Sequence, residues 1–266
     1  MTETDALDKE TAEAISNELL RLADSKLLLG YRYSQWMFSA PSLEACNAAS
    51  SISQDEFGHA RALYTAHLSM TDDVEEDELM HEREPEEYWN APALDQTSET
   101  WTELVVDAFL IDSAIGELVS ALEYDAIGRM QDKIEQEESF HDRYGHVWLT
   151  RLAGDDPEAT QAAVDETFES VYAWFGPEND VRQLQADSPR TDEPLVEADL
   201  RPPASEVREQ WLESVESVIE DVGLSFPDTP SPDREAWDGD RWRLDDGGPD
   251  QPSIEQLRGD ESAAFR

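Results

Sequence analysis

The sequence has a single cysteine, Cys46, so no disulfide can form within the chain, and a reducing compartment is the simpler expectation. Long apolar runs are also missing. No stretch of about 18 uninterrupted apolar residues occurs, which argues against a membrane-spanning helix. The first residues, MTETDALDKETAEA, are acidic, whereas a signal peptide begins basic and continues apolar. These absences predict a cytoplasmic protein with no membrane partner.

Basic residues are scarce as well. Lys and Arg number 19 against 63 Asp and Glu, which gives a net charge of −44. Such a charge argues against nucleic acid or an anionic membrane as a partner bound through a basic patch. A salt-rich cytoplasm, as in halophilic cells, would screen the mutual repulsion of these carboxylates. A disordered acidic chain is disfavoured, because 39% of the residues are hydrophobic and eight are Trp.

Helical periodicity is what the sequence does contain. Apolar residues recur at helical spacing in six segments, and several of these begin with recognisable caps. Thr100 and Glu103 have capping-box spacing, while Asp156 and Pro157 suit a cap and a first helical position. The predicted helices run from Glu10 to Ser39, from the turn SAPSLEA to about Ser69, from Thr100 to about Gly128, from there to Leu152, from Asp156 to Gly176, and from about Ser205 to Val222.

Two segments between and after these helices lack this periodicity. A crossover of about 25 residues follows Ser69 and is broken by Pro85 and Pro92, and long crossovers are typical of ferritin-like bundles. After Gly223 the sequence is rich in Pro, Gly and Asp, which predicts an extended or partly disordered tail whose Trp237 and Trp242 could dock onto the body. We therefore predict an all-α fold, with a ferritin-like four-helix bundle and extra C-terminal helices in residues 1–223 and an acidic tail in residues 224–266.

Each of the four long helices has an inward stripe with alternating three- and four-residue steps, the pattern of bundle helices. Every stripe is apolar except near its middle, where polar residues interrupt all four at about the same depth. The stripes are Ile15, Leu19, Leu22, Lys26, Leu29, Tyr33 and Trp36; Ala45, Ala49, Ile52, Glu56, His59 and Leu63; Val105, Ala108, Asp112, Ile115, Val119 and Leu122; and Ile134, Glu138, His141, Gly145, Trp148 and Leu152.

The polar interruptions have the composition of a metal site. Burying one unpaired carboxylate costs several kcal/mol. Ionisable groups that converge in a core must therefore compensate one another's charge or bind a metal. In two Glu-x-x-His pairs the Glu and His lie on the same helix face and can reach one metal, while Asp112 can bridge two. Oxygen-rich ligands with one imidazole per metal favour iron or manganese over zinc. The predicted metal ligands are Glu56, His59, Asp112, Glu138 and His141.

The Glu-x-x-His motif alone is weak evidence. The prediction depends on its position in the inward stripes, which we call the seams. The pairs lie in similar octapeptides, QDEFGHAR from Gln54 and QEESFHDR from Gln136, which suggests an internal duplication. EDELMHER from Glu76 repeats the spacing with Glu78 and His81, but within the predicted crossover. A lone inward His is more often a hydrogen-bonded core residue, whereas two with matching Glu residues favour a site. Arg61 and Arg143 either neighbour this site or face solvent, and His67 and His146 are expected at the surface.

The first helix departs from a complete site. A site of this class takes one carboxylate from each of two helices, and here the first helix offers Lys26, whose protonated ammonium cannot ligate. We hypothesise that Lys26 lies among Glu56, Asp112 and Glu138 and replaces part of the metal charge, which leaves a weakened or empty site. Glu18 is the runner-up ligand, two helical turns away.

Three segments carry a resemblance to a known family: GYRYSQWMFSAPSLEACNAASSISQDEFGHARALY, EREPEEYWNAPALDQTSETWTELVVDAFLID and EESFHDRYGHVWLTRLAG. From about Leu20 to Gly176 the chain resembles the phenylacetate-degradation oxygenases, namely the A and C subunits of phenylacetyl-CoA epoxidase. The resemblance implies an A subunit with a di-iron site that epoxidises the aromatic ring of the thioester. That protein uses dioxygen and electrons from a flavin and iron–sulfur reductase. The related C subunit would scaffold it.

The resemblance divides between the two subunits. GYRYSQW and residues 82–112 look like the C subunit, whereas the octapeptides look like the A subunit and imply the five ligands given above. Lys26 falls where the first-helix glutamate ligand of the A subunit is expected. We favour a C-type structural subunit, not catalytic alone, whose partners are the reductase and A-type and small B-type subunits. A catalytic A-type di-iron oxygenase and an iron-storage or peroxide-detoxifying protein remain alternatives. A di-iron centre and a metal-free site both stay open, and no catalytic or coenzyme-binding residue is assigned.

Overall fold

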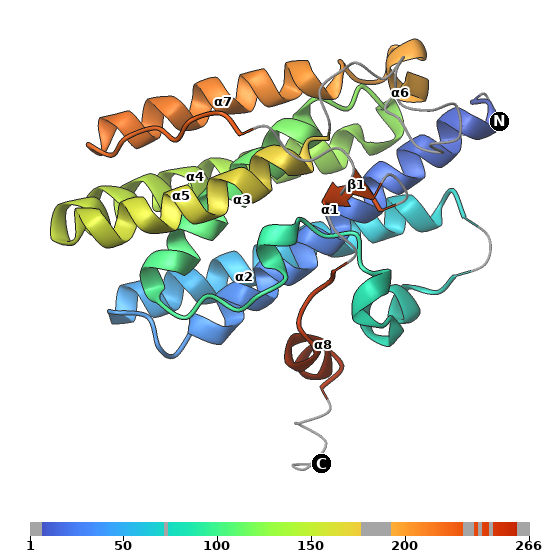
Figure 1. Ribbon diagram of the computed structural model, residues 1–266. Coiled ribbons are helices and arrows are strands. Elements are labelled where there is room, and N and C mark those ends of the chain that lie inside the picture. Colours follow the sequence, from blue (N-terminus) through green and yellow to red (C-terminus); the bar gives the residue numbers. More distant parts are fainter. Residues whose placement is uncertain are drawn as a thin grey trace.

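Four long helices form an all-α, ferritin-like bundle in the computed structural model (Figure 1). Helices α1 and α2 make one antiparallel hairpin, α3 and α4 make the other, and the predicted fold class is confirmed. The helices are α1 (Lys9–Trp36), α2 (Leu43–Leu68), α3 (Trp101–Ser120) and α4 (Gly128–Asp155). The structure describes residues 7–71, 74–176, 193–230, 237–238, 241–244 and 247–259. Among these residues, none of the helices combines the length and the apolar character of a membrane-spanning segment.

The helix starts follow the local sequence signals. Ser42 caps α2 by accepting from the Ala45 amide, and Thr100 and Glu103 form the predicted capping box of α3. The prediction that the third helix runs to Gly128 is wrong, because α3 ends at Ser120. A short helical turn, η5 (Asp125–Ile127), precedes α4. The Gln131 side chain donates to the carbonyls of Val119 and Leu122, so a tertiary contact satisfies the end of α3.

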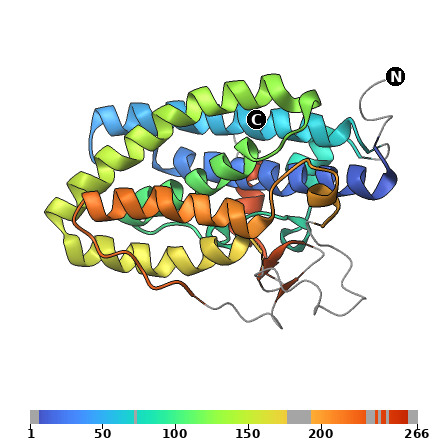
Figure 2. The same ribbon diagram turned by 90° about the horizontal axis from the view of Figure 1, so that it is seen from above.

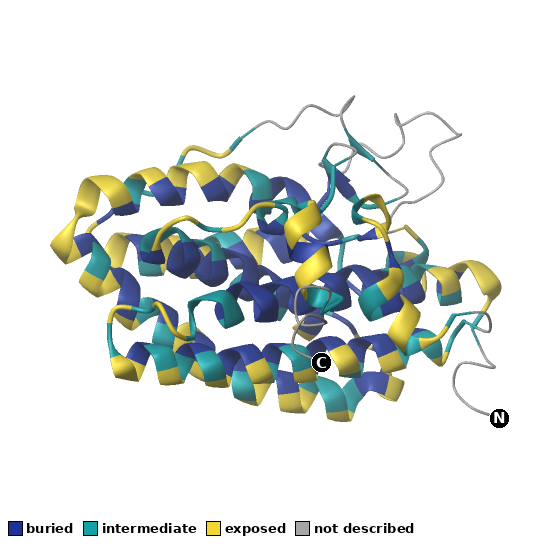
Figure 3. Ribbon diagram, turned by 90° about the horizontal axis from the view of Figure 1, so that it is seen from below, coloured by how far each residue is buried: buried dark blue, intermediate teal, exposed yellow. Residues whose placement is uncertain are grey.

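The predicted inward stripes form the core between the four helices. Their members are buried apart from Trp36 and Leu152, which are half-buried and pack against the core. Burial colouring shows the same pattern, with buried faces turned inward along the long helices (Figure 3). His67, expected at the surface, is buried instead, and its Nδ1 lies 2.9 Å from Ser16 Oγ. The helical periodicity therefore places almost every seam residue correctly.

The crossover between α2 and α3 contains the short helical turns η2 (Glu78–Glu82), η3 (Pro85–Glu87) and η4 (Pro92–Leu94) rather than an unbroken loop. The third Glu-x-x-His string, EDELMHER, supplies η2 and contributes no residue to the buried carboxylate group described below. Arg83, at the end of η2, pairs with the buried Asp24 of α1. The crossover is thus anchored to the bundle by a buried ion pair.

Helices α5 (Pro157–Trp174) and α7 (Ala204–Asp221) cover the second hairpin, and the short α6 (Glu193–Glu197) lies against the first. Helix α5 contacts α3 and α4, helix α7 contacts α3, and α6 contacts α1. Asp156 caps α5 as predicted, by accepting from the Ala159 amide. Trp211 of α7 stacks on Phe168 of α5, so these helices add an aromatic layer outside α3.

The C-terminal segment is more ordered than predicted wherever the structure describes it. Strands β1 (Trp237–Asp238) and β2 (Arg243–Leu244) pair antiparallel, and helix α8 (Gln251–Leu257) follows them. Arg258 donates to the carbonyls of His81 and Arg83, and Arg243 pairs with Asp95. Trp242 lies against Gly176, which confirms that it docks onto the body. Tail residues 231–236, 239–240, 245–246 and 260–266 lie outside the described residues.

Candidate metal centre

The polar interruptions of the four seams meet in the bundle core. Glu56 of α2, Asp112 of α3 and Glu138 and His141 of α4 each offer one ligand atom, and these atoms all lie within 4.8 Å of one another. All four residues are buried, and Glu56 is 0% exposed. The convergence that the seam pattern predicts is therefore present, while metal ligation itself remains a prediction.

A close approach of α1 and α2 turns Glu56 toward this cluster. A Cβ added to Gly30 of α1 would lie 2.9 Å from the Glu56 Cβ, closer than two such atoms can approach. Ser53, on the same side of α2, donates its hydroxyl to the Gly30 carbonyl at 2.8 Å. Only glycine at position 30 permits this packing, so the absence of a side chain there helps to place the carboxylate.

Lys26 of α1 lies among the carboxylates, as hypothesised. Its Nζ is 2.6 Å from Glu138 Oε1 and 3.1 Å from Glu56 Oε2, and it also donates to Asp112 Oδ1. Burial by itself lowers the pKa of Lys26, but the three carboxylates outweigh burial and raise it well above its ordinary value. The ammonium is therefore charged at neutral pH and neutralises part of the cluster.

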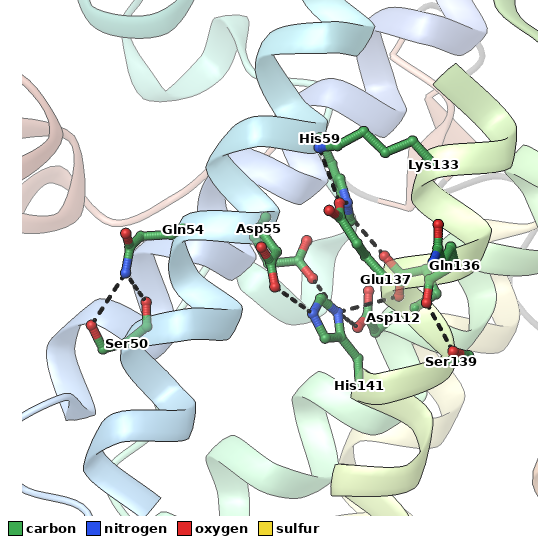
Figure 4. A network of polar contacts seen from close by, with 12 residues as sticks. Ser50, Gln54, Asp55, His59, Asp112, Lys133, Gln136, Glu137, Ser139 and His141 are labelled. Carbon is green, nitrogen blue, oxygen red and sulfur yellow. Dashed lines mark hydrogen bonds and ion pairs between the residues drawn. The ribbon is translucent and has the colours of Figure 1, made fainter. Parts of the chain in front are cut away.

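The two histidines differ in how closely they approach the cluster. His141 Nδ1 lies 3.0 Å from Glu56 Oε1 and 3.1 Å from Asp112 Oδ2. His59 Nδ1 lies 3.2 Å from Glu138 Oε1, but His59 is outside the group of four, and the two ring centroids are 6.2 Å apart. Figure 4 shows the rings between α2 and α4. Four of the five predicted ligands thus come together, with His59 at their edge.

Two further carboxylates at this site were not predicted. His59 Nε2 lies 2.7 Å from Glu137 Oε2, and His141 Nε2 lies 3.6 Å from Asp55 Oδ2 (Figure 4). Each histidine therefore turns Nδ1 inward and Nε2 toward an acidic residue of the opposite octapeptide. An outer carboxylate of this kind orients an imidazole and fixes its tautomer. The acidic residue that both octapeptides share just before the Glu was the available signal.

The cluster largely balances its own charge. Burial and the nearby Asp112 raise the pKa of Glu56 to about 7, and Lys26 offsets this only in part. Burial would also raise the pKa of Glu138, but Lys26 and the two histidines outweigh burial and hold it well below its ordinary value. His141, despite burial, has a raised pKa because Asp112, Glu138 and Glu56 accept from it. Of the two carboxylates Glu56 and Glu138, Glu56 therefore takes up a proton more readily.

A cleft of about 510 Å³ lies beside the cluster, between α3, α4 and α7. Its lining includes the buried Asp112 and Glu138 as well as the exposed Glu135 and Arg143, so it joins the cluster to the surface. Arg143 thus neighbours the site, one of the two alternatives that the sequence left open, while its own side chain is exposed to solvent. Arg61 takes the other alternative, because its side chain is 70% exposed and pairs with Glu76.

The residues match a metal centre only in part. Three carboxylates and one imidazole are a ligand set that iron or manganese accepts, and Glu138 Oε2 forms no hydrogen bond with any described residue. However, α1 contributes no carboxylate, and the Lys26 ammonium already contacts three of the four ligand residues. Glu18, the runner-up ligand, pairs with Arg21 and Arg201 instead. The arrangement therefore does not fit a complete two-metal centre.

A helical bundle with buried carboxylates and histidines from facing helices defines the ferritin-like class. Within that class, the chain belongs to the phenylacetic acid catabolic protein family, which it matches over residues 1–245. It is 22% identical to the C subunit of 1,2-phenylacetyl-CoA epoxidase of Escherichia coli K12 over 211 residues, covering 78% of this chain and 82% of that protein. It is 27% identical to the A subunit of the same enzyme over 202 residues, 73% of this chain. It spans 62% of that second relative, less than two thirds of its length.

These comparisons confirm the resemblance drawn from the sequence. Both relatives are subunits of one epoxidase, so the family relation is clear at the level of phenylacetic acid catabolism. The identities to the two subunits are similarly low, and they do not separate a C-type from an A-type role. The choice between these two roles depends instead on the residues of the buried cluster around Lys26.

Proposed function

We propose that this chain is a C-type, structural subunit of a multicomponent phenylacetyl-CoA epoxidase, and that it does not catalyse epoxidation alone. One observation carries the proposal: Lys26 contacts Glu56, Asp112 and Glu138 where a ferritin-like metal site needs a carboxylate from the first helix. An ammonium supplies positive charge to the carboxylates without binding dioxygen. The ancestral site is thereby kept folded without its metals.

The alternative role, that of the catalytic A-type protein, also has an observation in its favour. The ligand atoms of Glu56, Asp112, Glu138 and His141 remain within 4.8 Å of one another, and the cleft between α3, α4 and α7 reaches two of these residues. Iron bound there would supply dioxygen activation. The charged Lys26 argues against this role, because a metal in the cluster would have to displace it.

Other components complete the proposal. An A-type subunit would carry the epoxidation, a small B-type subunit would join the assembly, and a flavin and iron–sulfur reductase would deliver electrons. In that assembly this chain contributes a rigid helical surface rather than a reacting group. The similarity to two subunits of one epoxidase supports such a set of partners.

Reconstitution with phenylacetyl-CoA, dioxygen and reductase tests the proposal. The chain alone should consume no thioester, the A-type subunit of the same host alone should be weakly active or unstable, and the two together should turn over. Product is measured by mass spectrometry under native salt. Epoxide formation by this chain and reductase without any A-type subunit would overturn the structural role. Failure of the chain to bind the A-type subunit would overturn the assembly.

A further inference from the structure

The outer face of α4 differs in charge from the rest of this acidic chain. Six side chains occupy one side of the helix when laid out at about 3.6 residues per turn, opposite the seam that carries Glu138 and His141. All six are exposed. In order they are Arg129, Lys133, Phe140, Arg143, Val147 and Arg151, which we call the α4 outer stripe.

Exposed positive charge is concentrated on this stripe. Among the acidic residues of α4, Glu135 and Asp142 line the cleft on the α3 and α7 side, and Asp132 is an exposed acid at the edge of the stripe. Glu137 faces α2 and pairs with Lys133 at 3.1 Å, and Asp155 pairs with Arg151 at 3.7 Å. The stripe therefore gathers four cations, two of them paired with acids of the same helix, on a protein whose net charge is −44. Within the described ranges only six Lys or Arg side chains are exposed, namely the four of the stripe together with Lys9 and Arg61.

Apolar side chains lie between these cations. Phe140 is 48% exposed and Val147 is 63% exposed, two of the few large apolar side chains that the described residues leave exposed. The Phe140 ring stacks on Tyr144, which in turn contacts Trp148, so the exposed ring rests on an ordered aromatic row. Alternating cations and ordered apolar groups are the composition of a protein-binding helix face rather than of a solvated one.

The stripe is accessible along the length of the helix. In Figure 2, α4 and α2 run along one edge of the molecule, and α5 and α7 lie on the opposite side. The exposed or half-buried positions of the neighbouring α2 include the uncharged Asn47, Ser51, Gly58 and Ala62 as well as Glu44, Asp55 and Arg61. A partner helix lying along α4 would meet mixed charges toward α2 and the cations and apolar groups of the stripe on the outside.

We infer that the α4 outer stripe binds a helical surface of the A-type epoxidase subunit, one that carries acidic residues and exposed apolar side chains. The inference rests on the proposed function and names the surface that this function would use. An acidic partner is repelled by the carboxylate-rich faces and attracted only where cations gather, which selects one orientation. Phe140 and Val147 supply the apolar contacts that a stable interface needs at its centre.

The decisive measurement is the affinity of the chain for the A-type subunit of its own host, determined by titration under native salt. Arg143→Glu with Arg151→Glu should raise Kd at least about tenfold, and Phe140→Ser with Val147→Ser should do the same, because each pair removes central contacts. The matched control for the Arg143 and Arg151 variant changes the net charge by the same −4 elsewhere, by Lys9→Glu, Gln210→Glu and Ser217→Glu, and should leave Kd unchanged. Circular dichroism and thermal midpoints establish that every variant is folded.

The outcomes separate the inference from the proposed function. If the wild type and both stripe variants bind the A-type subunit equally well, the docking surface is wrong while the assembly stands. If the wild type does not bind, the proposed function fails first. Sedimentation of the chain alone is the further arm: a dimer that the stripe variants abolish would assign the surface to a second copy and overturn the inference. Binding of duplex DNA to the stripe would overturn it too.

Discussion

Two buried charge clusters are centred on residues two positions apart on α1 and are built differently. Asp24 is one anion surrounded by donors: it accepts from the Tyr64 hydroxyl at 2.5 Å, from the Trp89 amide at 2.7 Å and from the Arg83 guanidinium. Lys26 is one cation surrounded by three carboxylates, with His141 beside them. The first cluster is fully partnered, whereas the second contains more carboxylates than fixed cations.

This difference in partners indicates that the Asp24 cluster is a structural ion pair, whereas the Lys26 cluster is a remodelled metal site. Burial by itself lowers the pKa of Arg83, but Asp24 raises it above its ordinary value. Arg83 therefore stays charged and serves as the counter-ion of Asp24. Around Lys26, three carboxylates share one ammonium, and Glu138 Oε2 forms no hydrogen bond with any described residue. An excess of buried acceptors indicates a cluster whose architecture suits more positive charge than one ammonium supplies.

The largest expected effect is at Asp24. Asp24→Asn should lower the free energy of unfolding by about 3–5 kcal/mol, because Arg83 is left buried without a counter-ion and cannot lose its proton. Denaturant titration at pH 7 measures the change. Arg61→Gln, which breaks the exposed pair with Glu76, is the control and should cost less than about 1 kcal/mol. A loss at Asp24 no larger than that of the control would contradict the comparison.

Lys26→Met should be somewhat milder, at about 2–4 kcal/mol at pH 7, because the remaining carboxylates can take up protons whereas Arg83 cannot release one. Without the ammonium the carboxylate pKa values in the folded state rise above their unfolded values. The variant should therefore regain stability as the pH falls and lose it as the pH rises. Unfolding measured from pH 5 to pH 8 would show this slope, and a pH-independent loss would count against the cluster's description.

Lys26→Glu sharpens the comparison through metal content. It supplies the missing first-helix carboxylate, so iron bound per chain should rise relative to the wild type, and added iron should recover stability that the metal-free variant loses. Elemental analysis and thermal midpoints with and without ferrous iron give both readouts. Lys26→Gln, which removes the charge without adding a ligand, serves as the control. Wild-type protein that already holds two irons per chain would refute the displaced-metal description.

The smallest effect is expected at Asp107 of α3, a half-buried carboxylate with hydroxyl partners, Thr167 and Ser98, and no cation among its closest contacts. Burial raises its pKa from 3.8 to about 6. Between these values the folded state binds more protons than the unfolded state, so Asp107 makes stability fall as the pH rises from 4 to 6. Asp107→Asn should flatten that slope and add about 1 kcal/mol at pH 7. Unchanged pH profiles would show that Asp107 is not desolvated.

The sequence by itself determined the helices, the seams and the depth at which charges interrupt them. Apolar periodicity and caps such as Ser42 and Thr100 are local properties, and residues three or four positions apart share a helix face whatever lies opposite. This is why Lys26 could be assigned to the centre of the carboxylates before any contact was known. It is also why Glu56 and Glu138 were placed at matching depth.

Only the tertiary structure decided which atoms meet. The pairing of each histidine with the outer acid of the opposite octapeptide, Asp55 or Glu137, depends on how α2 and α4 face each other. The end of α3 depends on Gln131, and the docking of the C-terminal segment depends on Arg258 reaching carbonyls far away in the chain. Contacts between distant segments are set by packing geometry, which no local pattern of residues encodes.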